Sequence, residues 1–210
     1  MKKLLTTACL FILFSTSGMA ADLPNIGKWM IAPDMNPACW LNQLYEGKSL
    51  REPINMIIID RLSTSEAEAE TALLSACKAA GYPDRYGHST GYKGEMDGRL
   101  FSQFPQRNER AFSNRWFILN NNHGRIFGPY FKGGRYYFVA AFSREIVDWF
   151  KIKEIHQFGS FSQARDDFSW NMDRKTSYKV KGFLDLDNAI VGDPKVGTGD
   201  HDGLAVILGN

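Results

Sequence analysis

The stretch that decides the fold is residues 125–142, RIFGPYFKGGRYYFVAAF. Aromatic and aliphatic residues dominate it on both sides of Gly133-Gly134, and a pair of glycines between two such runs is typical of a β-hairpin turn. The second arm, residues 136–142, is apolar throughout, which predicts a strand in the middle of a sheet. The sequence therefore predicts a long hairpin, with half of its aromatic side chains facing the core.

Strands and helices are predicted on both sides of this hairpin. Further strands are expected at residues 53–60, 116–119, 178–184 and 204–208. The two main predicted helices are 64–80, opened by a capping box of Ser63 and Glu66, and 160–173, capped by Ser160 or Ser162. A short helix is expected at 38–46, a loop-rich region at 84–111 and a turn at 120–122.

This order of elements predicts an α+β fold: one domain with a mixed β-sheet, two main helices and an extended N-terminal arm. The expected boundaries are 1–20 for a signal peptide, 21–52 for the arm with its short helix, and 53–210 for the α+β domain. A chain of 210 residues that is 44% hydrophobic can bury a sizeable core without a metal or a network of disulfides.

The first twenty residues have the layout of a secretory signal peptide. Lys2 and Lys3 precede the apolar residues 4–14, and small residues follow up to Ala20. We expect cleavage after Ala20 and a periplasmic or secreted protein, with a retained N-terminal anchor as the alternative. The apolar run is shorter than the roughly 20 residues of a spanning helix, and no later segment is long enough, so no stable membrane span is expected.

The charges of the remaining chain are balanced. The whole chain has 25 basic and 23 acidic residues, and Lys2 and Lys3 account for the difference. Proteins that bind nucleic acid mainly through its phosphates need a basic excess, so no nucleic-acid partner is expected.

Cys39 and Cys77 are the two cysteines that follow the predicted cleavage site. An even number of cysteines in an oxidising compartment favours one disulfide, which would join the arm to the helix at 64–80. The alternative is two unrelated buried thiols.

Several motifs, taken in order, resemble the LssY C-terminal domain family, a poorly characterised bacterial module. Together these motifs cover most of residues 53–208. They are Pro53-Ile54-Asn55 followed by a helix ending at Gly81, the segment 140–145, His156 followed by Arg165-Asp166, Gly192-Asp193-Pro194, and Asp202-Gly203 followed by an apolar strand. Glu145 stands where the family has Asp. The resemblance implies a setting in the cell envelope, and it implies neither an activity nor catalytic residues.

One set of polar residues is expected to cluster: His156, Arg165, Asp166, Arg144 and Glu145. Arginine presents paired donors to carboxylate or phosphate, so this set can form an anion or sugar site. It can equally form a buried ion-pair network that fixes the second helix to the sheet.

Two other segments carry candidate ligand-binding residues. His123 and Arg125 follow three asparagines, where a tight turn between strands is the alternative explanation. His88 lies in YGHSTGY (86–92), which suits the wall of a binding loop, but the Gly-x-Ser-x-Gly elbow that would activate Ser89 is absent. The four histidines lack the spacing of a zinc site and the acidic residues 185–203 lack that of an EF-hand, so we expect no metal and no cofactor.

The function predicted from these features is that of an exported, non-catalytic module that binds an envelope component or a protein partner. The first alternative is a hydrolase of envelope glycan or lipid with His156 or His123 as its base. A deep pocket where histidine and acid converge would favour this alternative. The second alternative is a proteinaceous inhibitor of an envelope enzyme, acting through a protruding loop at 84–98.

Overall fold

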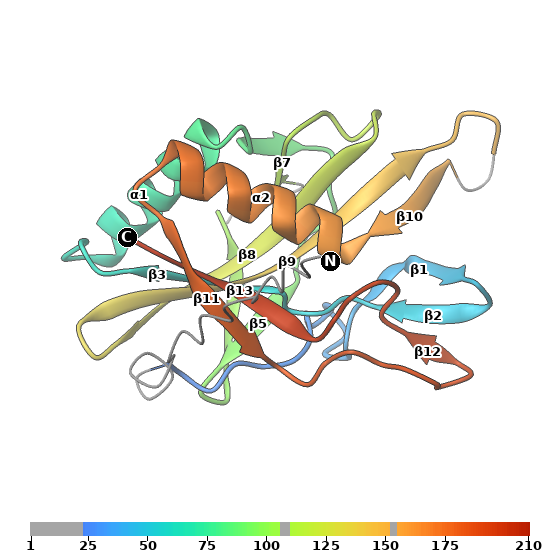
Figure 1. The fold of residues 1–210 in the computed structure, drawn as a ribbon, viewed down its shortest axis with the longest axis horizontal. Helices are drawn as coiled ribbons and strands as arrows, with labels where there is room; N and C mark the ends of the chain where they lie inside the picture. The colour runs from blue at the N-terminus through green and yellow to red at the C-terminus, as the bar shows by residue number, and fades with distance from the viewer. Residues whose placement is uncertain (1–22, 106–109, 152–154) are drawn as a thin grey trace, which may run out of the picture.

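The computed structural model describes residues 23–105, 110–151 and 155–210 (Figure 1). The predicted signal peptide and its cleavage site lie outside these residues. The described chain has a large mixed sheet with two helices, so the predicted α+β class is confirmed.

The predicted hairpin forms the centre of the sheet. Strand β8 (Asn121–Lys132) and strand β9 (Arg135–Val147) pair in antiparallel register, and β9 is buried along most of its length. Its other neighbour is β3 (Met56–Asp60), also antiparallel, and β13 (Leu204–Gly209) runs parallel to β3. The apolar arm of the hairpin therefore lies where strands cover both of its edges.

The remaining strands extend this centre on both sides. β11 (Lys179–Asp185) pairs with β13 at one end, and β6 (Arg99–Phe104) with β5 (Lys93–Met96) completes the other. Two short strands pair with the hairpin, β7 (Arg110–Ser113) with β8 and β10 (His156–Ser160) with β9, and β4 (Asp84–Tyr86) pairs with β7. A separate small sheet contains β1 (Cys39–Tyr45), β2 (Lys48–Arg51) and β12 (Val196–Gly197).

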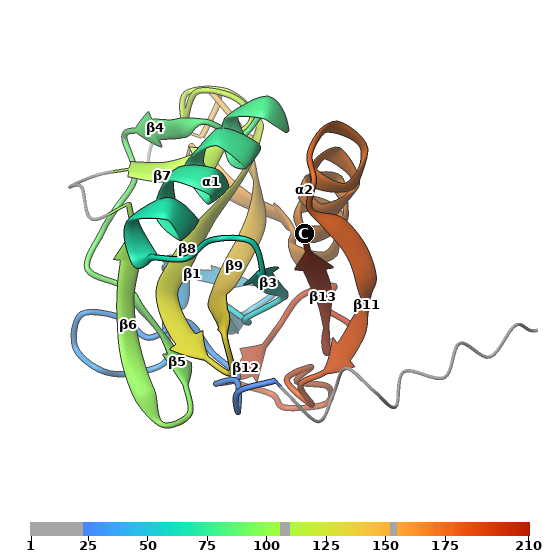
Figure 2. The same ribbon diagram turned by 90° about the vertical axis from the view of Figure 1, so that its left-hand side faces the viewer.

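The helices and the N-terminal segment cover opposite faces of the large sheet (Figures 1 and 2). Helices α1 (Glu66–Ala79) and α2 (Phe161–Lys175) pack on one face, where Leu73 and Phe168 enter the same buried cluster as Phe142. On the other face Met30 of the N-terminal segment packs with Val139 of β9. The alternation of side chains along β9 supplies both clusters, because residues 138, 140 and 142 face the helices and residues 137, 139 and 141 face away.

Serine caps start both helices. Ser160 Oγ accepts a hydrogen bond from the backbone N–H of Gln163 at 2.8 Å, as expected. The capping box of α1 lies two residues later than predicted: Ser65 Oγ accepts from the N–H of Glu68, and the Glu68 carboxylate accepts from the N–H of Thr64.

Four local predictions are wrong. Residues 38–46 form β1, not a helix, because Leu41 and Asn42 have positive φ and the segment pairs with β2. Residues 116–119 form an exposed turn, and β8 begins at Asn121 where a turn was expected. The segment 84–111 contains β4, β5, β6 and the start of β7 instead of being mainly loop.

The predicted disulfide between Cys39 and Cys77 is also wrong. Cys39 lies in the small sheet, where its sulfur is 3.1 Å from Ser49 Oγ. Cys77 is fully buried in the cluster between α1 and the large sheet. The two thiols belong to different layers, so no bond between them forms in this fold.

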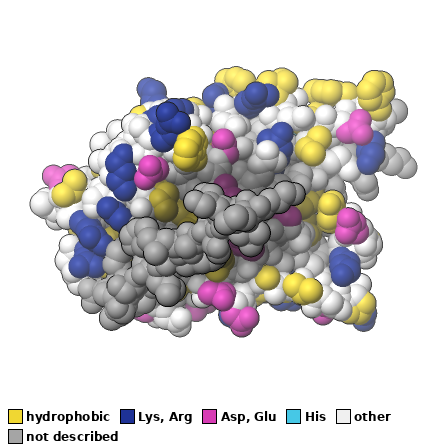
Figure 3. Space-filling view, in the orientation of Figure 1, with side chains coloured by type: hydrophobic (Ala, Val, Ile, Leu, Met, Phe, Trp, Pro, Cys, Tyr) yellow, Lys and Arg dark blue, Asp and Glu magenta, His cyan; other side chains and the backbone are white. Residues whose placement is uncertain are grey.

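Two surface properties were expected from the composition of the chain: a mixture of basic and acidic side chains, and no segment suited to span a membrane. Figure 3 shows basic and acidic side chains interspersed over one face of the molecule. Among the described residues, neither helix has the length and apolar character needed to cross a bilayer.

Candidate functional site

A cavity of about 210 Å³ lies at the end of the sheet where β8 begins and β9 ends. It faces away from the helices and collects side chains from β8, β9, β10, the loop between β4 and β5, and the small sheet. Five of the residues singled out in the sequence line it: His88, His123, Arg125, Glu145 and His156. We call this cavity the histidine pocket.

Glu145 is the centre of the histidine pocket. His156 Nδ1 donates a hydrogen bond to Glu145 Oε1, and His123 Nδ1 lies 3.6 Å from Glu145 Oε2. Glu145 is only 5% exposed, and this burial raises the pKa of its carboxyl, against the opposing effect of His156. The buried carboxylate is therefore hydrogen-bonded to His156 and lies close to His123, and His156 is the more exposed of the two imidazoles.

His123 is held as a neutral imidazole. Burial lowers its pKa well below the ordinary value, and the positive charges of neighbouring groups act in the same direction. Its Nδ1 lies 2.9 Å from Asn121 Oδ1, and the amide of Asn121 is oriented by its own donation to Leu119 O at 2.8 Å. Because Nδ1 faces an acceptor, Nε2 is the atom that can accept a proton.

His88 forms the facing wall of the pocket. Its ring centroid is 4.9 Å from that of His123, and burial lowers its pKa to about 4. Its buried Nε2 has no hydrogen-bond partner among the described residues, which is costly unless a ligand or water supplies one. Gly87 permits this placement, because it has φ of +101° and a Cβ there would lie 2.3 Å from the ring of Phe117.

Arg125 supplies the positive charge. Its guanidinium donates to Ser89 Oγ at 2.9 Å and to Ser89 O at 3.2 Å, and it lies 4.5 Å from the ring centroid of Tyr92. Glu52 Oε2 lies 3.9 Å from Arg125 Nη1. Burial raises the pKa of Glu52, and the positive charge of Arg125 opposes that rise. Each group therefore offsets part of the cost of burying the other's charge.

The predicted cluster of His156, Arg165, Asp166, Arg144 and Glu145 does not form as one unit. His156 and Glu145 lie in the histidine pocket, whereas Arg144 and Asp166 line a groove beside α2. The cause is strand alternation, since neighbouring residues of β9 point to opposite faces.

Arg165 has a structural role, in agreement with the ion-pair interpretation. It is 4% exposed, and its Nη1 donates to Asp202 at 2.6 Å and to Leu204 O at 2.8 Å. A third contact joins its Nε to Asp166 at 2.8 Å. These bonds fasten α2 to the start of β13.

The sequence interpretation missed one polar residue of the pocket lining, Glu52, and one residue that contacts His123 from outside the lining, Asn121. Glu52 precedes a predicted buried strand, and Asn121 lay in a predicted turn. Glu52 is far from the histidines in the sequence, so no local pattern indicates it. Asn121 is two residues before His123 on β8 and opposite Glu145 in the register, so strand alternation would have indicated it.

The chemistry available in the pocket is that of imidazoles, carboxylates and one guanidinium. Within residues 23–105, 110–151 and 155–210, no group of three or more His, Cys, Asp or Glu side chains is arranged to hold a metal ion. The groups present can bind a small polar molecule, accept a proton from it, and face a negative charge that develops on it.

Comparison with known proteins gives no relative from which a function can be transferred. No family model, no curated protein and no solved structure matches the chain. The resemblance to the LssY C-terminal domain family stays a prediction, and function has to be argued from the histidine pocket.

Proposed function

We propose that the protein is a hydrolase and that the histidine pocket is its active site. The observation that carries this proposal is the buried Glu145 carboxylate bonded to His156 Nδ1, inside a pocket that also holds Arg125 and two neutral histidines. Convergence of histidine and acid in one cavity is the feature that favours a histidine base over a purely structural cluster.

In this mechanism the Glu145–His156 pair is the general base. Glu145 accepts the Nδ1–H bond, which keeps the proton on Nδ1 and leaves Nε2 as the basic atom. Nε2 takes a proton from water as the water oxygen bonds to the electrophilic carbon or phosphorus of the substrate. The protonated imidazole then passes that proton to the leaving group as its bond breaks.

Arg125 is the group that would stabilise the negative charge formed during attack. Ser89 and Tyr92 fix its guanidinium, so little reorganisation is needed when the charge develops. The unpartnered Nε2 of His88 offers one further polar contact in the same cavity.

The size of the pocket limits what it can enclose. A cavity of about 210 Å³ holds a reactive group and not a whole polymer or lipid. Together with the export proposed from residues 1–20 and the proposed relation to an envelope family, this favours an ester or phosphoester group of an envelope glycan or lipid. A native protein that retains Met1 would contradict export.

The test is hydrolysis of p-nitrophenyl acetate, butyrate and phosphate by the purified protein. The wild type should hydrolyse one of them above the buffer rate, and His156→Asn should lower kcat/KM by about a hundredfold or more. Asp148→Asn, directly after β9 and outside the pocket lining, is the matched control and should keep full activity. Unchanged activity in His156→Asn, with melting temperatures equal to the wild type, would contradict the assignment.

A second candidate is non-catalytic binding of a small polar ligand by the same pocket. The unpartnered His88 Nε2 favours it, because a ligand acceptor or donor would satisfy that buried atom. In this case the wild type would hydrolyse none of the three esters. The prediction of a protruding inhibitory loop has less support, because the residues after β4 form a wall of the pocket.

A further inference from the structure

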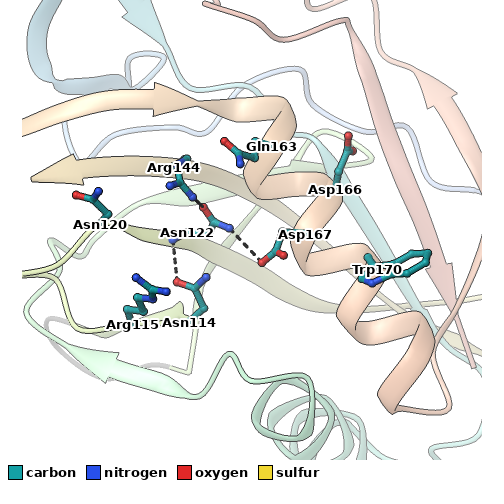
Figure 4. Close-up of a pocket in the computed structure, with 9 residues that line it drawn as sticks. All are labelled: Asn114, Arg115, Asn120, Asn122, Arg144, Gln163, Asp166, Asp167 and Trp170. Atoms are coloured by element: carbon teal, nitrogen blue, oxygen red, sulfur yellow. Dashed lines mark hydrogen bonds between the residues drawn. The ribbon is translucent and has the colours of Figure 1, made fainter.

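A second cavity, of about 730 Å³, lies between α2 and the ends of β8 and β9 (Figure 4). Its lining consists of three asparagines, one glutamine, two arginines, two aspartates and one tryptophan. Every lining side chain thus ends in a planar polar group or an aromatic ring. We call this cavity the amide groove.

The floor of the amide groove is a fixed hydrogen-bond network. Asn122 is 3% exposed, and its Oδ1 accepts a hydrogen bond from Arg144 Nη1 at 3.1 Å. Its Nδ2 donates to Asp167 Oδ2 at 3.1 Å, and its backbone N–H donates to Asn114 Oδ1 at 2.9 Å. Tyr82 also donates to Asp167 from below. The bond to Asn122 uses one of the five N–H donors of Arg144, so the others can serve a ligand.

An aromatic platform stands at one end of this network. Trp170 is 59% exposed on α2, and Figure 4 shows it on the helix beside Asp166 and Asp167. Arg174 lies 5.1 Å from its ring centroid, which helps to hold the indole in place. A large exposed aromatic ring next to convergent polar groups is typical of a recognition site.

We propose that the amide groove binds a short oligosaccharide. Planar amide, carboxylate and guanidinium groups match pairs of neighbouring sugar hydroxyls, each of which both donates and accepts hydrogen bonds. The C–H face of a sugar ring packs on an aromatic ring, as Trp170 allows. The formal charges of the two lining arginines and two lining aspartates cancel, which suits a polyhydroxylated ligand better than a strongly anionic one.

The amide groove is separate from the histidine pocket. Asn122 and Arg144 line the groove, whereas His123 and Glu145, their neighbours in the chain, line the pocket. Alternation along β8 and β9 places the two sets on opposite faces of the hairpin. Binding in the groove therefore neither requires nor implies catalysis in the pocket.

The experiment uses an array of bacterial and plant oligosaccharides, followed by calorimetry with the oligosaccharide that gives the strongest signal. The wild type should bind, and Trp170→Ala should weaken the affinity at least about tenfold. Trp149→Ala is the matched control, since Trp149 is similarly exposed, at 63%, in the turn between β9 and β10. That control and His156→Asn should both bind as the wild type does.

Two results would overturn the proposal. One is a wild-type protein that binds no oligosaccharide on the array. The other is equal affinity in Trp170→Ala and the wild type. A loss of binding in Trp149→Ala together with full binding in Trp170→Ala would place the site elsewhere and would likewise reject the amide groove.

Discussion

Lowering the pH from 7 to 4 is expected to destabilise the protein by about 3 kcal/mol for each of two buried histidines, His88 and His201. Burial lowers the pKa of both to about 4, from an ordinary value of 6.5. Arg125 and His156 add to the effect at His88, while Asp202 and Asp200 oppose it at His201. Because the stability of a small domain is about 5–15 kcal/mol, this loss is a large part of the total.

The direction of the effect follows from proton binding. Between pH 6.5 and 4 the unfolded chain binds a proton on each histidine and the folded chain does not, so falling pH favours unfolding. His123, with its pKa also lowered, acts in the same direction. Glu52 and Glu145 act in the opposite direction, since their raised pKa values let the folded state bind protons first, and they reduce the net loss.

Urea unfolding at pH 7 and pH 4 measures this loss. His88→Asn removes one of the contributions, so its stability should fall by about 3 kcal/mol less than that of the wild type over the same interval. Equal losses in the two proteins would show that His88 binds its proton equally well in the folded and unfolded states, and would contradict the lowered pKa described above.

Replacing Phe168 by alanine is expected to lower the free energy of unfolding by about 3–5 kcal/mol. Phe168 is fully buried at the centre of α2, its ring stacks on Phe142 with centroids 4.1 Å apart, and it meets Tyr82 edge-on at 5.0 Å. Through these three rings α2 packs on β9 of the sheet, which carries Phe142, and on the segment after α1, which carries Tyr82. Alanine would leave a cavity that the surrounding strands cannot fill without moving.

Denaturant unfolding of Phe168→Ala, compared with Trp170→Ala, tests this account of the core. Trp170 lies two residues further along the same helix but is 59% exposed, so its replacement should cost less than about 1 kcal/mol. A similar cost for the two variants would mean that α2 is not anchored through Phe168.

The elements that could be predicted are those whose signals are local. The hairpin at 125–142 has a Gly-Gly turn between aromatic runs, and α2 has its serine cap and an apolar face that buries Phe168. The segment 38–46 could not be predicted, because a pattern compatible with a helix is overridden by pairing with β2 and by positive φ at Leu41. The disulfide predicted between Cys39 and Cys77 failed because the first lies in the small sheet and the second lies under α1.

The candidate site could be predicted in part. His88, His123, Arg125, Glu145 and His156 do meet in one cavity, but they meet through strand register, which residue type does not reveal. Grouping Arg144 with Glu145 ignored the alternation that sends them to opposite faces. Glu52 is distant in the sequence from the histidines, and only the tertiary fold brings its carboxylate to 3.9 Å from Arg125 of β8.

The most direct measurement of the central claim is the tautomer of His156, read from the ¹⁵N chemical shifts of its ring in a long-range ¹H–¹⁵N NMR spectrum in alkaline solution. If Glu145 holds His156 as a base, the proton sits on Nδ1 and Nε2 has the shift of an unprotonated nitrogen. A His156 ring that carries its proton on Nε2 would contradict the Glu145–His156 pair, and with it the proposed active site.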